Sequence, residues 1–162
     1  MMTSAVGLGD INARFQVYIA NRPPLAEYQG LTTLRPMQHG EIGRIAAETG
    51  NHWRKIFNVY AKLLFAENPR GYDRWQSLRD DCLLQASSGT ALLFSPPPLQ
   101  AQEGSVRLVL GKGYAAECGL NDELHWLDER FARHSSGLLV CPYFDYRQLS
   151  DARIQQLIGL LP

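Results

Sequence analysis

The sequence lacks several features that would point directly to a function. It has no net charge, because 16 Lys and Arg residues balance 16 Asp and Glu residues, so the whole molecule has no strong field to attract a polyanion. Its three cysteines form no CxxC pair, and its four histidines form no HxxxH or HExxH pattern. We therefore expect neither a metal site nor another cofactor.

Long apolar runs are also missing. No stretch approaches the roughly 20 apolar residues that a helix needs to cross a bilayer. Residues 1–10 lack the basic and apolar regions of a signal peptide. We expect a cytoplasmic protein with no membrane partner. A GxSxG motif is absent as well, so nothing in the sequence favours a nucleophilic hydrolase.

The composition is typical of one globular domain. The chain has 162 residues, of which 45% are hydrophobic and 20% are charged, and a chain of this length buries enough surface to build its own core. We interpret residues 1–162 as a single domain in which residues 1–12 form a poorly ordered N-terminal segment. Residues 1–80 carry ten basic and seven acidic groups. Ordinary surface charge explains this imbalance, and a basic face is also compatible with it.

Four short apolar runs predict the strands of a central sheet. They span residues 15–20, 90–94, 106–110 and 138–141, and helices or long connections separate them. Such spacing favours parallel strands with helices on both faces. The predicted fold class is α/β: a three-layer sandwich with a four-stranded, mostly parallel central sheet in the order 2-1-3-4.

The clearest helical pattern follows Asn51. Apolar residues recur there at helical spacing, and we expect this face to pack on the sheet: Trp53, Ile56, Phe57, Tyr60, Leu63 and Leu64. The pattern alone places Trp53 in the core or at its rim.

The segments that follow the predicted strands are the candidate site, because ligands of open parallel sheets bind beyond the carboxyl ends of the strands. Residues 21–24 and 142–146 combine proline turns with polar and aromatic side chains. Residues 111–113, Gly-Lys-Gly, lack the further residues of a Walker loop or a dinucleotide fingerprint, and a tight strand-to-helix turn explains these glycines adequately.

Four segments resemble a known superfamily in their order along the chain. A strand leads into an Asn/Pro turn at 18–24, an Asn-aromatic helix start lies at 51–56, a strand enters a Gly-Lys turn and an alanine helix at 108–116, and a strand ends in a proline-containing loop at 139–150. This order resembles the uracil-DNA glycosylase superfamily, especially its mismatch-specific uracil/thymine branch. The resemblance spans residues 15–161 and implies a uracil-DNA glycosylase-like fold.

The resemblance also implies roles for particular residues. In that superfamily the loop after the first strand holds the Asp or Asn that activates water, and the loop after the last strand supports a base flipped out of DNA. Asn21 matches the first position, and Asp145 is the candidate that would stabilise a cationic sugar. Nucleobase or nucleic-acid contacts are implied for Arg22, Pro23, Trp53, Lys112, Tyr143, Phe144 and Tyr146.

Two departures change the expected activity. Arg22 separates Asn21 from Pro23, and the final loop lacks the His or Asn followed by Pro-Ser that the superfamily carries. An Asn orients water but cannot take its proton as a carboxylate would. We therefore expect a glycosylase-like protein whose classical site is altered or lost, and any surviving catalysis would be N-glycosidic hydrolysis.

Two kinds of partner follow from this interpretation. The first is DNA, a nucleobase or a nucleotide, held between residues 21–24 and 142–146. The alternative is a protein partner, bound by a non-enzymatic interaction module that uses the aromatic rim of the same scaffold.

Overall fold

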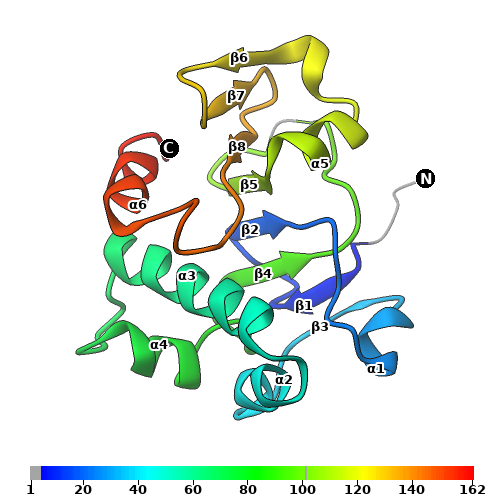
Figure 1. The fold of residues 1–162 in the computed structure, drawn as a ribbon, viewed down its shortest axis with the longest axis vertical. Coiled ribbons are helices and arrows are strands. Elements are labelled where there is room, and N and C mark those ends of the chain that lie inside the picture. Colours follow the sequence, from blue (N-terminus) through cyan, green and yellow to red (C-terminus); the bar gives the residue numbers. More distant parts are fainter. Residues whose placement is uncertain (1–4, 101) are drawn as a thin grey trace.

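The chain folds as an α/β protein with one mixed sheet of eight strands, shown as a computed structural model in Figure 1. The structure describes residues 5–100 and 102–162. The strands are β1 (Gly7–Gly9), β2 (Phe15–Tyr18), β3 (Leu34–Arg35), β4 (Thr90–Leu93), β5 (Val106–Leu110), β6 (Leu124–Trp126), β7 (Ala132–His134) and β8 (Leu139–Cys141). The helices are α1 (Ala26–Gln29), α2 (Glu41–Thr49), α3 (Asn51–Glu67), α4 (Trp75–Asp81), α5 (Lys112–Glu117) and α6 (Asp151–Ile158), with a 3-10 turn at Asn121–Glu123.

The four predicted strands form the centre of the sheet. They are β4, β2, β5 and β8, they lie side by side in the predicted order, and each neighbouring pair is parallel. The prediction of a four-stranded sheet is nevertheless wrong. β1 and β3 extend the sheet beyond β4, and β7 and β6 extend it beyond β8, where β1 and β7 run antiparallel to their central neighbours.

The N-terminal strand differs most from expectation. We predicted that residues 1–12 would be poorly ordered, but residues 7–9 form β1, and Leu8 is fully buried. Glycine allows this close pairing, since a Cβ at Gly9 would clash with the Thr90 carbonyl oxygen. Residues 1–4 of the same prediction lie outside the described residues.

Helices cover both faces of the central sheet. Successive residues of a strand point to opposite faces. On one face, Val17 and Leu108 pack in the large cluster that contains residues of α2, α3, α4 and α6. On the other face, Tyr18 and Val109 pack with Ala115 of α5. In Figure 1, α2, α3, α4 and α6 lie together. Helix α5 lies apart from this group.

Helix α3 contributes more residues to the larger cluster than any other helix. The predicted face is confirmed, because its members are all buried: Trp53, Ile56, Phe57, Tyr60, Leu63 and Leu64. The Tyr60 hydroxyl donates to the Ala91 carbonyl oxygen of β4 at 2.8 Å. This hydrogen bond fixes the helix against the central strands as well as satisfying a buried polar group.

Arg107 of β5 holds two loops on the α5 face. Its guanidinium is buried and donates to the carbonyl oxygens of Pro98, at 2.9 Å, and Ser136, at 2.7 Å. Burial lowers the pKa of this guanidinium. These two contacts attach the segment after β4 and the turn before β8 to the same strand.

We predict that Phe57→Ala destabilises the protein by about 3–5 kcal/mol, because it removes a fully buried ring and leaves a cavity. Arg54→Ala, on the exposed side of the same helix, should cost under about 0.5 kcal/mol. Urea denaturation of both variants measures the difference. Equal losses would contradict the assigned helix face.

Candidate functional site

The central strands bring four loops to one rim. Because β4, β2, β5 and β8 are parallel, the segments that begin at Phe94, Ile19, Gly111 and Pro142 all leave the sheet at the same edge. The Gly111 N–H donates to the Cys141 carbonyl oxygen at 2.9 Å, so the pairing of β5 and β8 continues to the start of these loops. This rim contains most of the residues that the sequence singled out.

Asn21 and Tyr143 meet at this rim, as the parallel arrangement predicted. The Tyr143 hydroxyl donates to Asn21 Oδ1 at 2.7 Å, and His52 Nε2 lies 3.0 Å from the same hydroxyl. A tyrosine has one hydroxyl proton, and Asn21 accepts it. His52 Nε2 must therefore be the donor in the second contact.

Tyr143 fills the space beside Asn21. Its ring stacks on His52 with centroids 5.7 Å apart, and its partial burial raises the pKa of its hydroxyl. The side-chain oxygen of Asn21 is thus occupied by a neutral phenol. A water molecule would have to compete with this phenol for Asn21 Oδ1.

Asp145 and Tyr146 are tied to helix α3. Lys55 Nζ lies 3.7 Å from one carboxylate oxygen of Asp145, and the other accepts the N–H of Arg147 at 2.9 Å. The Tyr146 hydroxyl accepts from Asn58 Nδ2 at 2.8 Å. These contacts give both side chains a structural role in holding residues 142–151 against the helix.

Three other predicted contacts are in the protein interior. Trp53 and Phe144 are fully buried, and Pro23 is buried too. The predicted base contacts by these residues need correction, because a ligand at the rim cannot reach a side chain that the core surrounds. Arg22 donates to three carbonyl oxygens, those of Tyr28, Gln29 and Leu31, and so braces the turn around α1.

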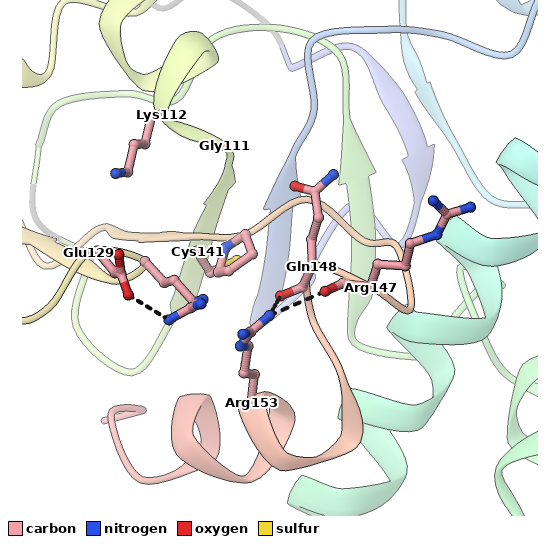
Figure 2. Close-up of a pocket in the computed structure, with 9 residues that line it drawn as sticks. Gly111, Lys112, Glu129, Cys141, Arg147, Gln148 and Arg153 are labelled. Atoms are coloured by element: carbon pink, nitrogen blue, oxygen red, sulfur yellow. Dashed lines mark hydrogen bonds and ion pairs between the residues drawn. The ribbon is translucent and has the colours of Figure 1, made fainter.

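A pocket opens beside this network, at the carboxyl ends of β5 and β8 (Figure 2). Its volume is about 390 Å³, within the range of small-molecule sites. Its walls come from the start of α5, the loop between β6 and β7, the segment after β8 and helix α6. The lining residues are Gly111, Lys112, Glu129, Arg130, Cys141, Pro142, Arg147, Gln148 and Arg153.

The pocket wall carries more positive than negative charge. Lys112, Arg130 and Arg153 oppose a single carboxylate, Glu129, which pairs with Arg130 at 3.1 Å. Figure 2 shows Lys112, Glu129 and Arg153 on different sides of the space, whereas the Arg147 guanidinium points away from them. A compact anion would therefore meet cations from several directions.

The backbone supports one of these cations. Arg153 Nη1 donates to the carbonyl oxygens of Arg147 and Gln148, at 3.2 and 3.1 Å. Both bonds are made by Nη1, and neither involves Nη2, the other terminal nitrogen of the guanidinium. The Cys141 thiol at the pocket floor is buried, which raises its pKa and keeps it neutral. The pocket thus favours binding an anion over thiolate chemistry.

Lys112 connects the pocket to an aromatic side chain. Its ammonium lies 5.0 Å from the ring centroid of Trp126 on β6. Of the residues predicted from sequence as ligand contacts, Lys112 is the one that lines this pocket. Sequence reasoning missed Arg130, Arg153 and Trp126, which come from segments that carry no motif and meet only in the folded chain.

His134, Ser136 and Glu123 have the composition of a nucleophile–base cluster, but the histidine is not accessible to a substrate. His134 Nδ1 lies 2.7 Å from the Ser136 hydroxyl, and its Nε2 lies 3.4 Å from a carboxylate oxygen of Glu123. The same Nδ1 accepts the Ser136 backbone N–H at 3.1 Å. The His134 side chain is only 2% exposed, so this arrangement closes the turn between β7 and β8 rather than facing a substrate.

The described residues contain neither a candidate metal cluster nor a candidate membrane span. Within residues 5–100 and 102–162, no three His, Cys, Asp or Glu side chains gather as they would around a metal ion. No helix in this described part of the chain is both long and apolar enough to span a bilayer.

The comparisons with known proteins give one match. Residues 6–162 match a protein family described as "Family of unknown function (DUF6942)". No curated protein and no solved structure matches the chain. The chemistry of the rim therefore has to be inferred from its geometry.

We predict that Asn21 and Tyr143 are energetically coupled. A double-mutant cycle with Asn21→Ala and Tyr143→Phe should give a coupling of about 0.5–1.5 kcal/mol, the net contribution of one hydrogen bond. Pairing Tyr143→Phe with Arg133→Ala, an exposed position on β7, should be additive. Denaturation midpoints measure all these variants, and an additive Asn21 pair would show that the contact is absent in solution.

Proposed function

The chain belongs to a family of unknown function (DUF6942), and from its geometry we propose that it binds a phosphate-bearing ligand of the nucleotide or nucleic-acid class. The observation that carries this proposal is the cationic pocket of about 390 Å³ at the carboxyl rim of β5 and β8. Open parallel sheets bind their ligands at this rim.

The cation types suit a phosphate. A guanidinium presents several N–H donors in one plane and forms paired hydrogen bonds with phosphate oxygens, while lysine contributes a mobile point charge. Arg130 and Arg153 approach from different walls and Lys112 from the start of α5. Glu129 limits the site to ligands that can compete for Arg130.

The same scaffold bears on the glycosylase interpretation. The order of the four central strands supports a distant relation to the uracil-DNA glycosylase superfamily. Asn21 Oδ1 is engaged by Tyr143 and Asp145 is paired with Lys55. These contacts support the interpretation that the classical catalytic site is altered or lost.

The protein-interaction alternative has its own supporting observation. Tyr146 of the aromatic rim is 40% exposed. Its ring, however, lies under Lys62, 4.9 Å away, and its hydroxyl is bonded to Asn58. The charge of the neighbouring pocket therefore favours an anionic ligand over a protein partner at this rim.

We predict that the protein binds inorganic pyrophosphate in low-salt buffer and that Arg130→Gln weakens binding about tenfold or more. Hydrogen bonds to charged groups contribute about 1.5–3 kcal/mol, and about 1.4 kcal/mol corresponds to a factor of ten. Arg133→Gln, an exposed arginine on the adjacent strand, is the matched control and should bind like the wild type. Isothermal titration calorimetry measures the three affinities.

Glu129→Gln should change the affinity for pyrophosphate in the opposite direction. Removing this carboxylate releases Arg130 and removes a repulsive charge, so affinity for pyrophosphate should rise severalfold, and the gain should shrink as salt is added. Loss of folding cannot produce tighter binding. Unchanged affinity in both the Arg130 and the Glu129 variants would rule out the pocket as the binding site.

We also predict little or no excision of uracil from duplex DNA. The water-orienting position holds an Asn whose side-chain oxygen is already bonded to Tyr143. A labelled oligonucleotide with a U·G, T·G or hypoxanthine pair, followed by cleavage at abasic sites, measures the activity. Robust turnover that disappears in Asn21→Ala would instead establish a working glycosylase.

A further inference from the structure

Trp126 is an exposed aromatic next to the cationic pocket. It ends strand β6 at the edge of the sheet, and 39% of its surface is exposed. Leu124, two residues earlier on the same strand face, packs against the cluster that contains Ala115 of α5. Trp126 extends along that face to the start of α5, where Lys112 lies.

The other two tryptophans have evident structural roles. Trp53 is fully buried in the core. Trp75 is half-buried, and the charged ends of Lys62 and Arg79 lie over its ring, at 5.3 and 5.4 Å from the centroid. Trp126 shares the cation contact of Trp75 but is the more exposed ring, so it remains open to a further aromatic partner.

Lys112 relates the ring to the pocket. Its ammonium is within 5.0 Å of the Trp126 centroid, and the same residue lines the pocket with Arg130 and Arg153. A ligand that has a phosphate and a planar ring joined by one sugar fits this arrangement. The phosphate would lie among the cations, and the ring would lie on the indole.

We propose that the ligand presents a nucleobase beside its phosphate and that the base stacks on Trp126. This inference rests on the proposed function, because it assigns the phosphate to the same pocket. Stacking on an aromatic side chain tolerates any base, since every base has a π face. The site would therefore discriminate nucleotides from simple phosphates without selecting a particular base.

The first test compares a nucleoside diphosphate with pyrophosphate. Wild-type protein should bind ADP about 5- to 150-fold more tightly than pyrophosphate, the range expected for one stacked base. Trp126→Leu should remove this preference, so that ADP and pyrophosphate bind to the variant with similar affinity. Trp126→Phe should keep part of it, because a smaller aromatic surface remains.

Tryptophan fluorescence gives an independent measurement. ADP should quench the emission of the wild-type protein, and the quenching should disappear in Trp126→Leu. Trp75→Phe is the matched control, since it removes another tryptophan with a cation over its ring, and it should keep the quenching. A third arm uses a short single-stranded oligodeoxyadenylate: tighter binding than ADP identifies a nucleic-acid strand as the source of the base, and weaker binding identifies a free nucleotide.

The outcomes separate the two proposals. If pyrophosphate binds but ADP binds no better, or if Trp126→Leu keeps the preference for ADP, stacking on Trp126 is overturned and the anion pocket stands. If neither pyrophosphate nor ADP binds, the proposed function fails and this inference fails with it.

Discussion

The parallel alignment of β4, β2, β5 and β8 is the constraint on which the rest of the structure depends. Parallel neighbours require crossover connections, so each strand is followed by a segment that must leave the sheet at the same edge. Residues that are 122 positions apart, Asn21 and Tyr143, become hydrogen-bonded for this reason. The cationic pocket follows from the same geometry, because Gly111 and Pro142 begin neighbouring loops at that edge.

The sequence predicted correctly those elements that a local hydrophobic pattern determines. The four central strands and the buried face of α3 were predicted because an apolar run or a helical period is a local property. β1 was missed because Gly-Leu-Gly has no strand propensity and pairs through close backbone approach to β4. The meeting of Asn21 with residues 142–146 was predicted from strand direction. Arg130 and Arg153 were not, since no local signal shows that a hairpin loop and the last helix face the same space.

Residues 142–151 contact helix α3 on one side and line the cationic pocket on the other. One side is fixed to α3 through His52, Lys55 and Asn58, which contact Tyr143, Asp145 and Tyr146 in turn. The other side forms a wall of the cationic pocket with Pro142 and Gln148. A binding site gains affinity when its walls are held before the ligand arrives, because less conformational entropy is lost on binding. The contacts that occupy the predicted catalytic residues thus give the neighbouring pocket a rigid wall.

The sheet ends in very short strands, two residues in β3 and three in β6. An outer strand exposes unpaired N–H and C=O groups, which are a template for pairing with another chain and for aggregation. Strands this short offer only a few such groups, so the wide sheet provides little opportunity for edge-to-edge polymerisation. The exposed Trp126 on β6 can therefore remain at the surface without that edge pairing with other copies of the chain.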